Sequence, residues 1–110
     1  MERIFEYDKE AFLKLLKRRG IEDSAVLEAM YAVPREMFVG VNLAEFAYDD
    51  TPLPIDEGQT ISQPYMVALM AQEMQIGPDD RVLEVGTGSG YAAAVLSRIA
   101  GEVYTIERHH

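Results

Sequence analysis

Hydrophobic residues in the first part of the chain recur at the spacing of two helices. We expect Asp8 to cap the first helix, which runs to about Arg19 and ends at Gly20. Its apolar face is formed by Phe12, Leu15 and Leu16. Asp23 or Ser24 caps the second helix, which ends before the next proline. The apolar positions of that helix are Val26, Met30 and Val33.

The pattern becomes irregular between residues 34 and 62, where proline and glycine repeatedly interrupt it. A short helical turn is predicted at 43–47, and a loop of this length usually has a function or contains unrecognised structure. Ser62 or Gln63 then caps a third helix, with Pro64 in the first turn, where proline is tolerated. The apolar stripe of this helix is Met66, Leu69, Met70 and Met74. We interpret the stripe as a core-packing face rather than a soft-metal site.

The last third of the chain has the pattern of a βαβ unit. An apolar run over 82–85 predicts a buried strand, and it stops at three alternating glycines. A helix is predicted from Tyr91 to Ala100, followed by a second strand over 103–106. We therefore expect an α/β fold, in which N-terminal helices rest on the first βαβ unit of a Rossmann-like sheet. Two strands leave that sheet incomplete.

The glycine turn indicates a ligand close to the main chain. Gly86 would permit the sharp turn, Gly88 would let the backbone approach the ligand, and Gly90 would let the helix pack tightly on the strand. The spacing G-x-G-x-G differs from the G-x-G-x-x-G of dinucleotide enzymes. A nicotinamide cofactor is therefore disfavoured.

Two acidic residues narrow the ligand further. Glu84 lies just before the first glycine, where a carboxylate repels a phosphate and favours a cationic group. Glu107 ends the second strand, where an acid accepts hydrogen bonds from ribose hydroxyls; the alternative is that it only caps an exposed strand end. S-adenosylmethionine has a sulfonium, an amino acid end and an unphosphorylated ribose. It is the cofactor that this pattern predicts.

Composition and charge exclude several classes. The 110 residues set a limit of one domain, and a 48% hydrophobic and 26% charged composition is ordinary for a globular protein. The net charge of −9 argues against a nucleic-acid partner, because phosphates need a basic surface. The chain has no apolar run of the ~18 residues that a membrane span needs. Its first residues, Met1-Glu2-Arg3, are not a secretory signal, so we expect a cytoplasmic protein with no membrane partner.

Metal chemistry is not expected either. The chain has no cysteine, so it has neither disulfides nor a thiolate metal site. His109 and His110, whether native or the remnant of a purification tag, lack the further ligands that a metal ion requires.

Four sequence blocks indicate a particular protein family, beyond the secondary structure that they predict. They are Pro34–Val39 (PREMFV), Ala47–Ile55 (AYDDTPLPI), Gln59–Met66 (QTISQPYM) and the glycine turn. Together they resemble the protein-L-isoaspartate O-methyltransferase family, from about Ile4 to Arg108. The segment Thr60–Pro64 is the specific part, since many methyltransferases share the glycine turn.

The resemblance implies a protein-repair enzyme. Members of the family transfer the methyl group of S-adenosylmethionine to the α-carboxylate of L-isoaspartyl residues in damaged proteins. Isoaspartyl-containing peptides and proteins are therefore the implied partners. Ser62 is the implied catalytic residue, although the helix pattern alone favours a plain helix cap at this position.

The resemblance also implies two sets of binding residues. The cofactor set is Thr60, Ile61, Gln63, Glu84, Gly86, Thr87, Gly88, Gly90, Glu107 and Arg108. The substrate set is Tyr48, Asp49, Leu53, Pro54 and Ile55. A carboxylate nucleophile needs no base, so such residues position and desolvate the reactants rather than move protons. This agrees with a sequence that shows no His–Asp or Cys–His pattern.

We expect residues 1–77 to form a helical cap with the substrate and cofactor loop, and residues 78–110 to form the first βαβ nucleotide-binding unit. Because the family carries further strands, we expect the chain to be the N-terminal portion of a longer enzyme and to have little activity alone. Two alternatives stay open: another S-adenosylmethionine-dependent methyltransferase, and a non-catalytic fragment or interaction module. The sequence also leaves the oligomeric state open, and dimerisation or domain swapping would be one way to order the unfinished sheet.

Overall fold

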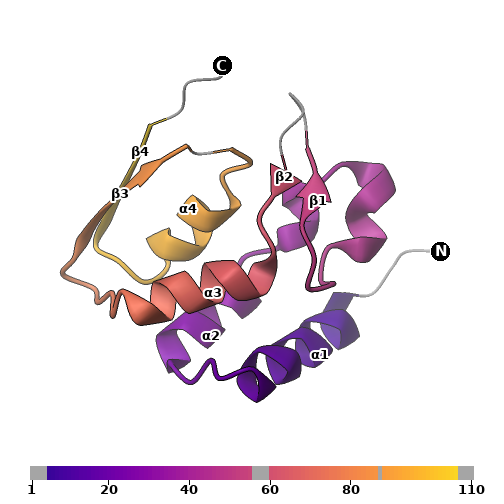
Figure 1. Ribbon diagram of the computed structural model, residues 1–110, viewed down its shortest axis with the longest axis horizontal. Coiled ribbons are helices and arrows are strands. Elements are labelled where there is room, and N and C mark those ends of the chain that lie inside the picture. The colour runs from indigo at the N-terminus through magenta and orange to yellow at the C-terminus, as the bar shows by residue number, and fades with distance from the viewer. Residues whose placement is uncertain (1–4, 56–59, 87, 107–110) are drawn as a thin grey trace.

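Helices form the N-terminal part of the fold and a pair of parallel strands forms its C-terminal part (Figure 1). The computed structural model describes residues 5–55, 60–86 and 88–106. In chain order the helical elements are α1 (Phe5–Arg18), α2 (Ser24–Ala32), the 3-10 helices η1 (Arg35–Phe38) and η2 (Val41–Phe46), α3 (Pro64–Glu73) and α4 (Tyr91–Ser97). The strands are β1 (Leu53–Pro54), β2 (Thr60–Ile61), β3 (Arg81–Val85) and β4 (Glu102–Ile106). This order confirms the predicted arrangement of helices first and a βαβ unit last.

The first helix begins earlier than the sequence suggests. Since α1 already includes Phe5, Asp8 lies inside the first turn, and the prediction that Asp8 caps the helix is wrong. Its carboxylate still favours the positive end of the helix dipole. The predicted end is confirmed: Gly20 adopts φ +101°, and the Ile21 N–H donates to the Leu16 carbonyl at 3.0 Å.

The second helix begins where the sequence places it. Asp23 is the N-cap of α2, and its Oδ1 accepts the N–H groups of Ala25 at 2.9 Å and Val26 at 3.4 Å. Gln72 of α3 joins this turn to the third helix, because its Oε1 accepts the Asp23 N–H at 2.9 Å while its Nε2 donates to the Gly20 carbonyl at 3.0 Å. The three helices are thereby fixed at one corner of the fold.

The irregular segment between residues 34 and 62 contains structure that its sequence pattern hides. The helical turn predicted at 43–47 is confirmed as part of η2. β1 and β2 form an antiparallel pair in which Leu53 lies opposite Ile61 and Pro54 opposite Thr60. Strands of two residues, one of them a proline, are too short to leave an alternating pattern, so sequence periodicity could not predict this hairpin.

The third helix buries a different face from the predicted one. Its buried residues are Pro64, Val67, Ala68 and Ala71. Met66, Met70 and Met74 are 43%, 59% and 51% exposed, so the prediction that they pack in the core is wrong. It is confirmed for Leu69, which is partly buried against the core. The small side chains at 68 and 71 allow α3 to pack closely, and Met70 and Met74 are left on the side that faces β3.

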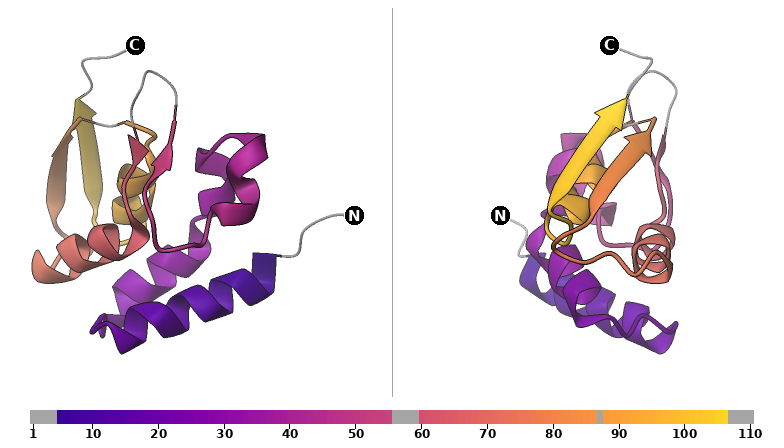
Figure 2. Two further views of the ribbon diagram at one scale, coloured as in Figure 1. Left: turned by 45° about the vertical axis from the view of Figure 1, so that its right-hand side comes forward. Right: turned by 90° about the vertical axis from the view of Figure 1, so that its left-hand side faces the viewer.

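The strands β3 and β4 pair in parallel, with Val82 opposite Val103 and Leu83 opposite Tyr104. The helix between them, α4, covers one face and ends at Ser97, earlier than the predicted Ala100. The opposite face is uncovered (Figure 2). Leu83, Val85, Tyr104 and Ile106 all point to that face and are 60%, 76%, 56% and 56% exposed.

A single hydrophobic core connects the helical part to the strand pair. Phe12 and Leu16 of α1, Met30 of α2 and Tyr91 and Val95 of α4 are each at most 2% exposed. In the part of the chain that the structure describes, no helix combines the length and the apolar character needed to cross a membrane.

Candidate active site

The glycine turn connects β3 to α4 as the sequence predicts. Gly86, Gly88 and Gly90 have φ values of +85°, +56° and +86°, a left-handed conformation that side chains with a Cβ rarely adopt. The Gly86 N–H donates to the Ile106 carbonyl at 2.7 Å and extends the ladder between β3 and β4 by one hydrogen bond. Gly90 is the N-cap of α4. The turn therefore needs glycine for its backbone conformation.

The space beside the turn is open at the first two glycines. A Cβ added to Gly86 or Gly88 would meet no atom within 4 Å, so a ligand can approach the main chain there. At Gly90 an added Cβ would lie 4.0 Å from the Phe38 ring of η1, which is an ordinary contact. The prediction that Gly90 allows close packing of helix on strand is therefore wrong, and its positive φ is the reason for glycine.

Ser62 and the glycine turn share a cavity of about 80 Å³. It is lined by Ile61, Ser62, Val67, Glu84, Gly86, Gly88, Ser89, Tyr91 and Ala92. Gln63, not Ser62, is the N-cap of α3. Ser62 is exposed, and no residue in the described ranges hydrogen-bonds its hydroxyl. The helix-cap alternative for Ser62 is thus wrong, and the hydroxyl faces the turn with its hydrogen-bonding capacity available.

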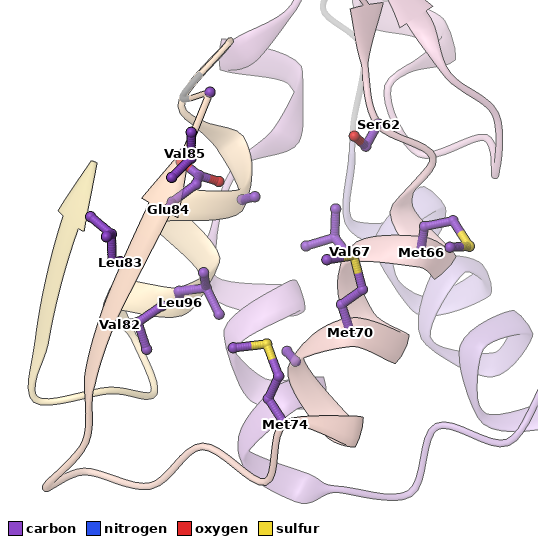
Figure 3. A pocket seen from close by; sticks show the side chains of 13 residues that line it. Ser62, Met66, Val67, Met70, Met74, Val82, Leu83, Glu84, Val85 and Leu96 are labelled. Carbon is purple, nitrogen blue, oxygen red and sulfur yellow. The ribbon is translucent and has the colours of Figure 1, made fainter. Parts of the chain in front are cut away.

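A larger cavity of about 380 Å³ lies between α3 and β3 and shares Ser62, Glu84 and Gly86 with the smaller one. Figure 3 shows Met70 and Met74 extending from α3 toward Val82 and Leu96 on the other side. The two cavities together form a cleft with an apolar wall and one polar end, where Glu84 and Ser62 lie. Such a cleft suits a ligand that has both apolar and polar parts.

Two of the predicted substrate residues are core residues. Tyr48 is only 7% exposed, its ring packs against Phe12 with centroids 5.6 Å apart, and its hydroxyl donates to the Glu36 carboxylate. The same hydroxyl oxygen accepts the Arg35 N–H at 3.1 Å. Burial and the Glu36 hydrogen bond raise the pKa of Tyr48. Leu53 is 8% exposed, so the structure places both side chains beneath the loop rather than at its surface.

The remaining predicted substrate residues divide between two sides. Asp49 is exposed and lines a separate cavity of about 310 Å³ against α1, so it does not meet Ser62. Pro54 is exposed and Ile55 is half-buried at the β1–β2 hairpin, whose second strand leads directly to Ser62. Of the substrate set, only these two lie on the hairpin side with accessible surface.

The predicted cofactor residues are partly brought together. Ile61, Glu84, Gly86 and Gly88 line the Ser62 cavity, and Gly90 follows as the cap of α4. The Gln63 amide instead donates to Asp50 Oδ2 at 3.0 Å. Thr60 pairs with Pro54 through its backbone. Thr87, Glu107, Arg108, His109 and His110 lie outside the described residues, so the role expected of the strand-end acid stays a prediction.

Two residues near the site were missed by sequence reasoning. Asp50 holds the start of α3, where it accepts the Tyr65 N–H at 2.9 Å and pairs with Arg19. Arg35 is fully buried and donates to the Ser62 carbonyl at 3.0 Å. The sequence carries no local signal for either contact, because the partners lie many residues away.

In the described ranges, no group of three or more His, Asp or Glu side chains gathers as a metal site would.

A parallel strand pair linked by a glycine turn and a helix, with a polar cleft at the carboxyl ends of the strands, defines a Rossmann-like α/β chain of the methyltransferase class. The profile of the family described as Protein-L-isoaspartate(D-aspartate) O-methyltransferase matches residues 7–110. The chain belongs to this family.

Relatives and solved structures agree with that assignment. The chain is 67% identical over 93 residues to protein-L-isoaspartate O-methyltransferase 1 of Geotalea uraniireducens, covering 84% of this chain and 42% of the relative. It is 61% identical over 103 residues to protein-L-isoaspartate O-methyltransferase of Roseiflexus sp., covering 94% of this chain and 47% of the relative. The chain thus spans about half the length of the curated relatives it matches.

Two solved structures share the fold. A protein-L-isoaspartate O-methyltransferase superposes with a TM-score of 0.79 at 32% identity, covering 93% of this chain and 34% of that one. A Plasmodium falciparum protein described under the same activity, in complex with S-adenosyl-L-homocysteine, superposes with a TM-score of 0.75 at 33% identity. That match covers 92% of this chain and 49% of the other. The family is S-adenosylmethionine-dependent.

Proposed function

We propose that this chain carries the donor site and the transfer site of an S-adenosylmethionine-dependent methyltransferase that acts on the α-carboxylate of L-isoaspartyl residues in damaged proteins. The observation that carries the proposal is the shared cavity of Ser62 and the glycine turn, with Glu84 at its edge. Family membership supports the reaction class. The parallel strands and the glycine spacing support the donor.

The residues at the strand end fit the donor. The open space at Gly86 and Gly88 lets a ligand lie against the main chain, and Glu84 offers a negative charge to a cationic ligand. S-adenosylmethionine, when bound, supplies a methyl group activated by a cationic sulfur. In this proposal Gly86, Gly88 and Glu84 hold its amino acid end, and Ile61 closes the cavity on the other side. Thr87, Glu107 and Arg108 complete the site.

Ser62 acts on the nucleophile in this proposal. Its hydroxyl donates a hydrogen bond to one oxygen of the substrate carboxylate and so fixes the direction of the attacking lone pair. The carboxylate stays ionised, because no proton has to move before or during the transfer. Met70, Met74 and Leu96 line the apolar end of the cleft, opposite the polar end where Ser62 and Glu84 lie.

The substrate peptide is proposed to approach over the β1–β2 hairpin. Pro54 and Ile55 offer accessible surface there, and β2 leads from the hairpin to Ser62. Tyr48 and Leu53 support the loop from inside the core. In this division of roles residues 1–77 form the helical cap with the substrate and cofactor loop, and residues 78–110 form the βαβ unit that holds the donor.

The test measures transfer of radiolabelled methyl groups from S-adenosylmethionine to an isoaspartyl peptide. Ser62→Ala is expected to lower the rate by about tenfold or more, as loss of a positioned hydrogen-bond donor does. Ser97→Ala is the matched control, because Ser97 is exposed on α4 and its hydroxyl donates only to the Ala94 carbonyl. Equal rates for the wild type and Ser62→Ala, or equal transfer to the matching aspartyl peptide, would contradict the proposal.

We further propose that the 110-residue chain alone binds the donor weakly and transfers slowly. The support for this is the uncovered face of β3 and β4, which leaves the strands that carry the site without packing on one side. Titration calorimetry with S-adenosyl-L-homocysteine measures the affinity directly. Tight binding would contradict this proposal, whereas binding without any transfer would favour a non-catalytic module. Transfer to a substrate other than isoaspartyl peptide would favour another methyltransferase.

A further inference from the structure

We propose that Arg35 is a positioning residue that fixes the distance between the donor turn and the transfer serine. This inference rests on the proposed function, because it assigns Arg35 to the same site. The Arg35 guanidinium group contacts three segments of the chain at once.

Arg35 lies completely inside the fold, with 0% exposure. Its Nη2 donates to the Ser62 carbonyl at 3.0 Å and approaches the Thr51 carbonyl at 3.5 Å. Its guanidinium carbon lies 4.6 Å from the centroid of the Tyr91 ring. A single planar group therefore touches the loop before β1, the residue that carries the proposed catalytic hydroxyl, and the first residue of α4.

Burying the Arg35 charge costs free energy of folding, because the charge loses its hydration. Within the described ranges no carboxylate forms an ion pair with Arg35, and its Nε and Nη1 atoms have no hydrogen-bond partner. A buried charge without a paired carboxylate is normally avoided in favour of an apolar side chain of similar size. Burial accordingly lowers the pKa of the group, while Tyr91, Tyr48 and Asp50 counteract that effect. An apolar side chain could fill the same space, but it could not donate a hydrogen bond to the Ser62 carbonyl while its other face contacts the Tyr91 ring.

Arg35 contacts residues on both sides of the Ser62 cavity. Tyr91 directly follows Gly90, the last glycine of the turn, and lines that cavity. A contact to the Tyr91 ring is therefore a contact to the donor side of the cavity. Ser62 marks the opposite wall. A displacement of about 1 Å between reacting groups can lower a rate by about 100-fold, so a rigid link across this gap serves the reaction directly. The planar fork of arginine supplies such a link, whereas a lysine ammonium keeps the charge without the fork.

The kinetic test compares Arg35→Lys with Arg19→Lys in the full chain. Arg19 is the matched control, because it also stacks on a tyrosine, with its guanidinium carbon 3.7 Å from the Tyr65 ring centroid, but its side chain is 42% exposed. We expect Arg35→Lys to lower kcat for methyl transfer by about tenfold, with the KM for S-adenosylmethionine changed less than about threefold. Arg19→Lys should change kcat less than about twofold. Equal effects of the two substitutions on kcat would overturn the proposal.

The second test is independent of activity. The chain has no cysteine, so Thr51→Cys and Ser97→Cys, both at exposed positions, can carry a pair of nitroxide labels. Double electron–electron resonance then measures the distance between the loop before β1 and helix α4. The proposal expects a narrow distribution with Arg35 and a broader or shifted one in Arg35→Lys and Arg35→Met. Unchanged distributions in the folded variants would overturn it.

The two tests separate the two proposals. If the wild-type chain transfers no methyl group, the proposed function fails, and the distance distributions alone decide the role of Arg35. A merely structural role would lower the melting temperature of both Arg35 variants but leave the distance distribution of the folded protein unchanged. If Arg35→Met does not fold, Arg35→Lys, which retains the charge, still gives the answer.

Discussion

Asp50 caps helix α3 across fifteen residues of sequence: its Oδ1 accepts the backbone N–H of Tyr65 at 2.9 Å. Tyr65 is the second residue of the helix, and the residue at the N-cap, Gln63, provides no side-chain cap. The Gln63 amide instead donates to the other carboxylate oxygen at 3.0 Å. The start of α3 lies directly after Ser62, so this long-range cap fixes the backbone at the proposed transfer site.

Replacing Asp50 with alanine should therefore destabilise the fold. We expect Asp50→Ala to lower the free energy of unfolding by about 1–2 kcal/mol, because the Tyr65 N–H loses its acceptor. Asp50→Asn is the matched variant: it keeps an oxygen for the Tyr65 N–H and replaces the oxygen that accepts the Gln63 amide and pairs with Arg19, an ion pair worth about 0–1 kcal/mol near the surface. Urea unfolding followed by circular dichroism measures both. An alanine variant as stable as the asparagine variant would show that the cap contributes nothing.

Substitution of Gly86 by alanine should destabilise the fold, whereas the same substitution at Gly77 should be tolerated. Gly86→Ala forces a Cβ into a backbone conformation with φ +85°, and we expect a loss of about 1–2 kcal/mol in the free energy of unfolding. It should also abolish binding of S-adenosyl-L-homocysteine, because the added methyl group occupies the open space beside the turn. Gly77 does not have a positive φ, and its added Cβ would lie 3.7 Å from Asp80 Oδ2. Gly77→Ala should change stability by less than about 0.5 kcal/mol, and a similar loss in both variants would contradict this account.

The stability of the fold should fall as pH rises from about 10 to about 12. Burial raises the pKa of Tyr91 to about 12, and Arg35 partly opposes the shift. An unfolded tyrosine loses its proton near pH 10, so the folded state binds more protons than the unfolded state in this window. Stability is then complete below about pH 10 and decreases through the folded pKa, by up to about 3 kcal/mol from this residue. Urea unfolding at several pH values measures the slope.

The control for this pH dependence is Tyr91→Phe. It removes the titrating hydroxyl while keeping the ring that stacks with Arg35. We expect the decrease between pH 10 and 12 to become smaller, with the contribution of buried Tyr48 remaining. An unchanged slope would mean that Tyr91 does not titrate with the raised pKa.

The uncovered sheet face should make the isolated chain associate as its concentration rises. Leu83, Val85, Tyr104 and Ile106 form a continuous apolar surface beside unpaired strand edges. Val85→Thr with Ile106→Thr should reduce association without a large loss of stability, since both side chains are exposed and threonine suits a strand. Sedimentation velocity over a concentration series measures the effect.

The matched control for the sheet face is Val82→Thr. Val82 is 9% exposed and points to the face that α4 covers, so its substitution should lower stability and leave association unchanged. If the wild type stays monomeric at all concentrations, the exposed face does not drive association.

Much of the βαβ unit could be predicted from the sequence, because its signals are local. The alternation of glycines at 86, 88 and 90 specifies a turn with positive φ, and the apolar runs before and after it specify parallel strands. The caps at Asp23 and Gly20 were predictable for the same reason, since each contacts residues only a few positions away. The Asp8 cap was misplaced because the helix begins earlier than its apolar pattern.

The sequence by itself determined the order of elements, the family and the backbone of the glycine turn, because these depend on short-range conformational preferences and on motif residues that lie together in the chain. Only the tertiary structure decided that α3 buries its alanines instead of its methionines and that Tyr48 lies in the core. It also decided that Arg35 binds the Ser62 carbonyl and that Asp50 caps the start of α3 just after it. Those outcomes depend on contacts between residues far apart in sequence, where the packing of one element against another determines which side chains become buried.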